Sequence, residues 1–238
     1  MAEPRQLPLS IKLRDSSVFA SYYAGRNALV VDTLLALRPE SHRPATWIYG
    51  PLATGKTHLL QALCARAGGT QQPAAYLPMV QVLPLGPGML AGCGRLSWVC
   101  LDDIAATAGH DDWERALFAL YTELEDSGGR LVVTAACAPS GAAFKLKDLA
   151  SRFGGGTVLK LQPFDDDEQR EALKLHAVRR GLDLPDETAA FLLNRLPRDM
   201  HTLCGFLDEL DDAALVAQRR LTVPFVSAIL RKVPGASP

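Results

Sequence analysis

Gly50-Pro51-Leu52-Ala53-Thr54-Gly55-Lys56-Thr57 follows the G-x-x-x-x-G-K-[ST] pattern of a phosphate-binding loop. Its flanks fit that pattern, because residues 46–49 predict a short buried strand and residues 58–65 predict a helix. The backbone N–H groups of such a loop point inward at the helix N-terminus and can cradle a di- or triphosphate. We therefore expect a nucleotide site that runs from Gly50 to His58, with Lys56 on the terminal phosphates and the Thr57 hydroxyl on Mg²⁺. The alternative is a purely structural Gly-rich turn.

A second anchor is the apolar segment Leu96-Ser97-Trp98-Val99-Cys100-Leu101-Asp102-Asp103, which predicts a strand that ends in two carboxylates. In phosphate-loop proteins the magnesium-directing Asp lies here, at the carboxyl end of a central parallel strand. We expect Asp102 to join Thr57 in holding Mg²⁺. Asp103 occupies the place where many ATPases carry a Glu that polarises the attacking water, and its side chain is one methylene shorter. The alternative is a strand that ends in a solvated Asp-Asp turn.

Further apolar segments alternate with helical patterns on both sides of these anchors. Strands are predicted at residues 74–77, 130–137 and 157–161, and helices at residues 26–38 and 112–125 and within residues 144–153. Strands that alternate with helices in this order predict a parallel, right-handed α/β sheet. Residues 78–95 are rich in Gly and Pro and have no period, so their structure stays open.

The character of the chain changes after Pro163, where no strand pattern follows up to about residue 232. Helices are predicted at residues 166–181, 186–195, 199–218 and 223–232. We therefore expect an α/β nucleotide-binding domain over residues 15–162 and a small all-helical domain over residues 163–238.

Residues 1–14 predict an extended tail, because they contain Pro4 and Pro8 and have no helical period. Within the tail, Gln6 is followed by the alternating apolar residues Leu7, Leu9 and Ile11. Such a strip either docks into a groove of a partner protein or forms an ordinary first strand, and the residue pattern favours neither.

Composition excludes several classes of protein. The net charge of −1 argues against a basic nucleic-acid surface. The 5 cysteines are scattered without a C-x-x-C pair, which favours a reduced, cytoplasmic protein without structural zinc. The N-terminus lacks a signal-peptide pattern and no apolar run approaches membrane-spanning length, so secretion and membrane insertion are not expected.

Together these features resemble the DnaA-type AAA+ family, and within it the Hda family of regulators that inactivate the replication initiator DnaA. The most specific matches are the tail motif Gln6-Leu7-Pro8-Leu9 and the segments at residues 148–153, 160–163 and 221–226. The resemblance implies an AAA+ P-loop domain, with a parallel sheet flanked by helices, and a small all-helical lid. It also implies two partners, DnaA and the DNA polymerase III sliding clamp (its beta subunit), with DNA reached only through the clamp, and it allows a homo-oligomer.

The resemblance assigns roles to individual residues. Gln6, Leu7 and Leu9, with Ile11 at the end, match the family's clamp-binding motif, usually Gln-Leu-x-Leu-Pro-Leu. The proline lies at Pro8 in this chain, and Ser10 stands where the motif has its proline. Arg152 matches the arginine finger that acts in trans, and Arg198 matches the sensor Arg that faces the nucleotide. Their alternatives are a surface ion pair for Arg152 and a solvated Arg at a helix start for Arg198.

Three departures from the family bear on hydrolysis. Ala136 stands where relatives have a polar residue near the γ-phosphate, Ala53 replaces a common glycine, and Asp103 is short. We therefore expect a regulator that binds ADP or ATP with Mg²⁺, hydrolyses ATP weakly or not at all, and stimulates hydrolysis of the ATP bound to DnaA. The rivals are a DNA-binding initiator or loader of the DnaA type and a stand-alone ATPase or small-molecule kinase.

Overall fold

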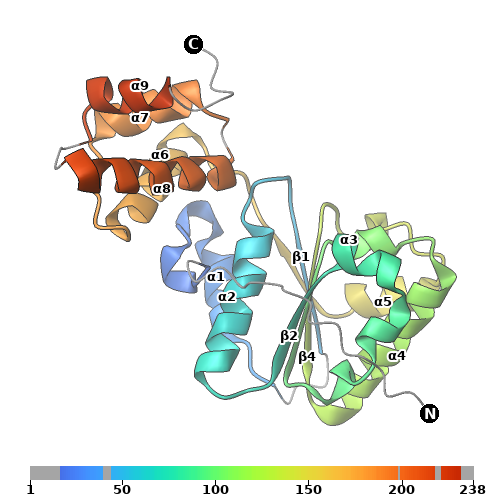
Figure 1. The fold of residues 1–238 in the computed structure, drawn as a ribbon. Coiled ribbons are helices and arrows are strands. Elements are labelled where there is room, and N and C mark those ends of the chain that lie inside the picture. Colours follow the sequence, from blue (N-terminus) through green and yellow to red (C-terminus); the bar gives the residue numbers. More distant parts are fainter. Residues whose placement is uncertain (1–16, 40–43, 198, 218–220, 232–238) are drawn as a thin grey trace.

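A computed structural model of the chain describes residues 17–39, 44–197, 199–217 and 221–231 (Figure 1). The predicted tail and Arg198 lie outside the described residues. The described chain forms an α/β domain and a helical domain, and the helical domain lies on the side of helices α1 (Ala28–Ala36) and α2 (Lys56–Gly69) (Figure 1).

The α/β domain is built on a five-stranded parallel sheet in the order β2-β3-β4-β1-β5. Its strands are β1 (Ala45–Tyr49), β2 (Ala74–Pro78), β3 (Trp98–Asp102), β4 (Arg130–Ala135) and β5 (Thr157–Lys160). Because all of them run in one direction, the loop after β1 and the Asp at the end of β3 meet at the same edge of the sheet. The parallel α/β sheet predicted from the sequence is confirmed.

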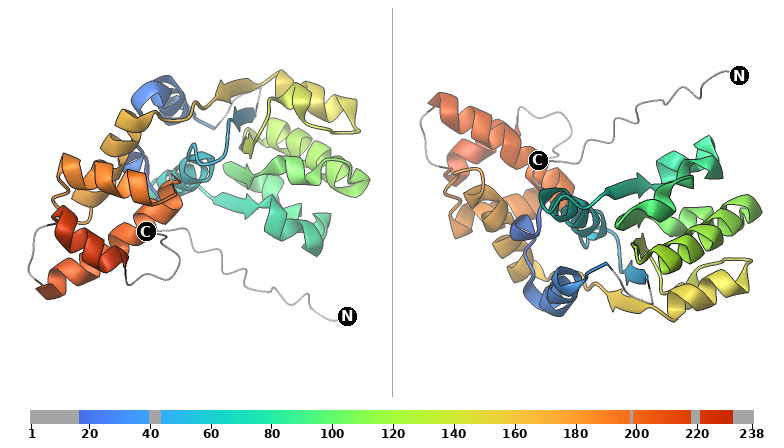
Figure 2. Two further views of the ribbon diagram at one scale, coloured as in Figure 1. Left: turned by 90° about the horizontal axis from the view of Figure 1, so that it is seen from above. Right: turned by 90° about the horizontal axis from the view of Figure 1, so that it is seen from below.

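Side chains of the central strands alternate between two hydrophobic layers. Trp47, Leu101 and Val133 pack with α3 (Met79–Val82), α4 (Asp111–Ser127) and α5 (Lys147–Gly154) on one face. Ile48 and Cys100 pack with α1 and α2 on the other face. Figures 1 and 2 show these two groups of helices on opposite sides of the sheet. Burial on both faces explains why the strands read as continuous apolar runs.

The Gly- and Pro-rich segment left open by the sequence forms α3 followed by 3₁₀ turns at Leu83–Leu85, Pro87–Leu90 and Cys93–Arg95. Pro84 lies at the start of the turn Leu83–Leu85, and Pro87 starts the turn Pro87–Leu90. A missing backbone N–H is tolerated at both places. Met79, Val82 and Leu90 are buried in the core, so the segment is part of the domain. Further 3₁₀ turns lie at Phe19–Ser21, Gly25–Asn27, Ile104–Thr107 and Pro139–Gly141.

In the α/β domain, two predicted elements end two residues earlier than expected. The helix expected over residues 26–38 is the 3₁₀ turn Gly25–Asn27 followed by α1, which ends at Ala36 because Leu37, at φ −59° and ψ 138°, leaves the helical conformation. The strand expected over residues 130–137 stops at Ala135, the last residue that pairs with β1.

The helical domain contains α6 (Asp166–Val178), α7 (Asp186–Arg195), α8 (Met200–Ala217) and α9 (Val223–Leu230), as expected apart from their ends. Asp165 caps α6, since its Oδ1 accepts the N–H of Glu168 at 3.0 Å while Glu168 accepts the N–H of Asp165. Gly181, at a φ of 75°, follows the end of α6. These helices enclose a hydrophobic core of their own. Within the described ranges, no helix is long and apolar enough to cross a membrane.

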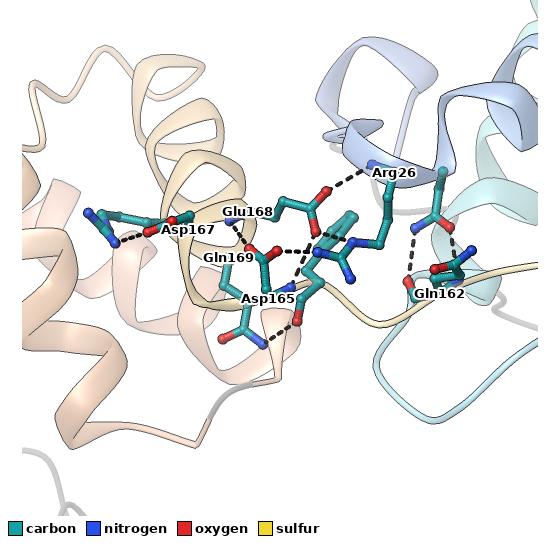
Figure 3. A network of polar contacts seen from close by, with 9 residues as sticks. Arg26, Gln162, Asp165, Asp167, Glu168 and Gln169 are labelled. Atoms are coloured by element: carbon teal, nitrogen blue, oxygen red, sulfur yellow. Dashed lines mark hydrogen bonds and ion pairs between the residues drawn. The ribbon is translucent and has the colours of Figure 1, made fainter.

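A polar network joins the two domains at the linker (Figure 3). Asn27 pairs with the backbone of Gln162, accepting its N–H at 2.8 Å and donating to its carbonyl at 3.0 Å. Arg26 forms ion pairs with Asp165 and Glu168, and its N–H donates to Glu168 at 2.8 Å. The residues that start the first helix of the helical domain are therefore tied to the segment that starts α1.

Replacing Arg26 by Ala should loosen this linker, because the ion pairs that join α6 to the α/β domain are lost. We expect faster hydrogen–deuterium exchange of the backbone amides at residues 162–168 in Arg26→Ala. The matched control is Arg170→Ala, because Arg170 pairs with Asp167 inside the same helix. Equal exchange at the linker in both variants would contradict the role given to Arg26.

Candidate nucleotide site

The phosphate-binding loop connects β1 to α2, and its lysine is folded over the loop backbone. Lys56 Nζ donates to the carbonyl oxygens of Gly50, at 2.8 Å, and Pro51, at 2.7 Å. Burial lowers the pKa of Lys56, and the charges of Asp103 and Asp102 oppose that shift. The ammonium group is thus held at the loop, where an anion would meet it.

The loop is supported from outside by Tyr22. The hydroxyl of Tyr22 donates to the Thr54 carbonyl at 3.0 Å, and its ring lies where a Cβ on residue 55 would come within 2.5 Å. Gly55 also has a φ of 84°, so glycine is required here for two reasons. Burial raises the pKa of Tyr22, which keeps the hydroxyl protonated as a donor.

Asp102 is the centre of the polar contacts at this edge of the sheet. Its Oδ2 accepts the hydroxyls of Thr57 at 2.7 Å and Tyr76 at 2.8 Å, and its Oδ1 accepts the hydroxyl of Thr134 at 2.5 Å. The structure therefore brings together Thr57 and Asp102, the two residues expected to hold Mg²⁺. Desolvation and the Asp102 charge raise the pKa of Tyr76, so this hydroxyl also stays a donor.

Asp103 follows directly in a left-handed conformation, with a φ of 54°. Its backbone N–H donates to Thr134 Oγ1 at 2.9 Å, which fixes the turn after β3. Desolvation and the Asp102 charge raise the pKa of Asp103, while Lys56 acts in the opposite direction. Ala136 is exposed just beyond the end of β4 and does not line the cleft described next.

A cleft of about 1120 Å³ extends from the loop to the helical domain. Its α/β side includes Lys56, Thr57, His58, Tyr76, Asp102 and Asp103, and its helical side includes His176, Arg180, Met200, Cys204 and Asp208. The cleft therefore joins the phosphate loop to a wall made by α6 and α8.

Two histidines meet across this cleft, one from each domain. The rings of His58 on α2 and His176 on α6 lie 6.3 Å apart in an edge-to-face arrangement. Burial, the His58 ring and the nearby Arg180 lower the pKa of His176 to about 4, and burial also lowers the pKa of His58. Both rings are neutral at pH 7, so the two histidines themselves offer aromatic surface to the cleft rather than positive charge.

The residues present fit a nucleotide with Mg²⁺. The loop supplies backbone N–H groups and the Lys56 ammonium, and Thr57 and Asp102 supply a hydroxyl and a carboxylate, the oxygen donors that Mg²⁺ prefers. Within the described part of the chain, no cluster of at least three His, Cys, Asp or Glu side chains could hold a metal ion. A metal here would thus depend on phosphate oxygens for further ligands.

Arg152 lies outside this cleft, on α5. Its Nη1 donates to Glu125 at 3.0 Å, and its guanidinium stacks 4.8 Å from the ring centroid of Phe118 and 5.0 Å from that of Tyr121. The side chain is 35% exposed and does not line the cleft of its own chain. The ion pair that the sequence analysis named as the alternative for Arg152 is therefore present, and part of the Arg152 side chain remains exposed.

Three residues of the site were not found from the sequence: Tyr22, Tyr76 and Thr134. Thr134 sits inside an apolar strand, and Tyr76 in a short one, where a single hydroxyl carries no motif. The order of parallel strands could have pointed to them, because β2 and β4 flank β3 and place these side chains beside Asp102.

Comparisons with known proteins agree with this arrangement. Residues 166–230 match the family model of the Hda lid domain. The whole chain is similar to domain III of the replication initiation protein DnaA from Thermotoga maritima, with a TM-score of 0.77 and 22% identity over 95% of this chain and 100% of that chain. The chain has the fold of a DnaA-type AAA+ protein and carries an Hda-type lid. The fold class and the family resemblance inferred from the sequence are confirmed.

Other solved structures extend the likeness. DnaA from Aquifex aeolicus bound to AMPPCP has a TM-score of 0.66 and 20% identity over 83% of this chain and 66% of that chain. The RuvB Holliday junction branch migration motor of Thermotoga maritima has a TM-score of 0.63 and 18% identity over 90% of this chain and 73% of that chain. These likenesses concern the fold of the chain.

Ala53 offers a direct test of the loop conformation. It has a φ of 61°, which is costly for any residue with a Cβ, so the glycine common at this position has a physical reason. We expect Ala53→Gly to raise the free energy of unfolding by roughly 1 kcal/mol, measured by denaturant titration of the nucleotide-free protein.

The matched control is Ala119→Gly on the exposed side of α4, which should lower the free energy of unfolding by about 1 kcal/mol because glycine weakens a helix interior. A loss of stability in both variants would show that Ala53 is not strained.

Proposed function

We propose that the chain is a negative regulator of replication initiation that binds a nucleotide and the DNA-loaded sliding clamp and stimulates hydrolysis of the ATP bound to DnaA. The observation that carries this proposal is the Hda-type lid at residues 166–230 on a fold similar to that of DnaA. An arginine that acts in trans requires contact between two domains, and the fold shared with DnaA makes DnaA the proposed partner.

The ligand proposed for the cleft is ADP or ATP with Mg²⁺. The contacts of Lys56, Thr57 and Asp102 support phosphate and metal binding, and DnaA itself has been solved with AMPPCP. Weak or absent hydrolysis by this chain is supported by the short Asp103 side chain, held in a left-handed turn, and by Ala136, which carries no polar group. The ligand is thus proposed to support the fold and the assembly rather than to turn over.

Arg152 is the residue proposed to act on DnaA. Because it does not line the cleft of its own chain, it has no place in hydrolysis there. Its guanidinium rests on the aromatic face of α4 while 35% of the side chain remains accessible, so a neighbour's phosphates could displace Glu125 from it. An arginine supplied in trans stabilises the charge of the transferring phosphoryl group and can contribute 10³–10⁵ in rate.

Clamp binding is assigned to the tail, through Gln6, Leu7, Leu9 and Ile11. The near-neutral net charge supports contact with DNA through the clamp rather than directly, and reduced cysteines support a cytoplasmic setting. Self-association into a homo-oligomer is compatible with the AAA+ fold. A DNA-binding initiator of the DnaA type is the alternative function.

Replacing Leu7 and Leu9 by Ala should abolish retention on clamp-coated beads, because the apolar contacts of an extended docking motif are lost. The melting temperature should stay unchanged, whereas an ordinary first strand would make it fall. Full retention of the double variant would reject the tail as the docking motif. Salt-sensitive binding of the parent protein to DNA without clamp would favour the initiator alternative.

Replacing Arg152 by Ala should leave ADP affinity and clamp binding unchanged and slow DnaA-bound ATP hydrolysis by about a thousandfold if the finger dominates, measured under single-turnover conditions. Arg152→Lys should rescue little, because an ammonium lacks the planar fork of a guanidinium.

The matched control is Glu125→Gln, which removes the ion-pair partner and keeps the arginine. If Arg152 only ties α5 to α4, Glu125→Gln should impair stimulation as severely as Arg152→Ala. Parent-level stimulation by Arg152→Ala would rule out the finger.

A further inference from the structure

The hydroxyl of Tyr76 touches the metal-directing carboxylate although no sequence motif includes it. Tyr76 is the middle residue of β2 and lines the cleft, and its hydroxyl donates to Asp102 Oδ2 at 2.8 Å. Strands β2 and β3 already pair through their backbones from Ala74 to Pro78. The hydroxyl is therefore not needed to hold the two strands together.

Asp102 is braced from both of its neighbouring strands. It ends β3, which lies between β2 and β4. Tyr76 comes from β2 and holds Oδ2, while Thr134 comes from β4 and holds Oδ1. Two donors on opposite oxygens fix the rotation of a carboxylate about its Cβ–Cγ bond.

The bracing leaves few acceptor sites on the carboxylate. A carboxylate offers about four lone-pair sites, and Thr57, Tyr76 and Thr134 fill three of them. The remaining site lies on Oδ1, since Oδ2 accepts two hydroxyls. Mg²⁺ keeps several of its waters in protein sites, and a fixed acceptor on the carboxylate that Thr57 contacts is suited to hold such a water.

We propose that Tyr76 is a positioning residue that sets how strongly Mg²⁺ tightens nucleotide binding, by fixing the orientation of Asp102. The inference rests on the nucleotide site of the proposed function and does not involve DnaA or the clamp. Groups that orient a metal's carboxylate partners typically change metal affinity by 10–100-fold when removed. The phosphate contacts of Lys56 and the loop do not pass through Tyr76, so binding without metal should not depend on it.

The test is calorimetric titration of Tyr76→Phe with ADP, in Mg²⁺ and in EDTA. We expect the affinity in EDTA to equal that of the parent protein, and the gain in affinity on adding Mg²⁺ to fall by about tenfold. Asp102→Asn supplies the lower limit for that gain. Tyr23→Phe is the matched control, because it removes a tyrosine hydroxyl from a ring that packs on Phe164, away from Asp102.

Three results would overturn the inference. They are a full Mg²⁺ gain in Tyr76→Phe, an equal loss of affinity in Mg²⁺ and in EDTA, and a parent protein whose ADP affinity does not respond to Mg²⁺. An equal loss accompanied by a lower melting temperature would make Tyr76 a structural residue. Each of these results leaves stimulation of DnaA to be judged in its own assay, so the inference can fail while the regulatory role stands.

Discussion

The geometry of the nucleotide site depends on the hydrogen bonds that the carboxylate of Asp102 accepts. Three hydroxyls from three different elements converge on it: Thr57 from α2, Tyr76 from β2 and Thr134 from β4. A buried carboxylate is tolerated only when its oxygens accept hydrogen bonds, and these three hydroxyls supply them. The Lys56 ammonium is held on the loop at the same edge of the sheet. The positive charge of Lys56 and the negative charge of Asp102 therefore have fixed positions relative to each other.

The lid completes the cleft because the linker is held at both sides. Asn27 binds the backbone of Gln162, and Arg26 binds the capping residues of α6, so the first lid helix starts from a defined place. The ring of His176 on that helix packs against the ring of His58, which directly follows Thr57 on α2. The low pKa of His176 keeps this contact neutral at pH 7. Contacts at the linker therefore determine which lid side chains face the loop.

The sequence predicts this molecule well where a signal is local. Apolar runs, glycines and the Gly50–Thr57 pattern placed the strands of the sheet, the loop and the lid helices within a few residues. It failed where structure depends on distant partners. Residues 79–95 are helical turns because Met79, Val82 and Leu90 reach the core, which no local period reveals. Tyr76 and Thr134 become site residues only through the strand order, and Arg152 is found on an aromatic platform that only tertiary packing creates.

The proposed regulator acts on the nucleotide of another protein. The most direct measurement follows hydrolysis of ATP pre-bound to DnaA, in a single turnover, with the parent chain, with and without clamp loaded on DNA. We expect rapid conversion to DnaA-bound ADP only when chain and loaded clamp are both present, and little hydrolysis of ATP by the chain alone. DnaA-bound ATP that persists unchanged in the complete mixture, or turnover by the chain without DnaA, would rule out the proposed action on DnaA.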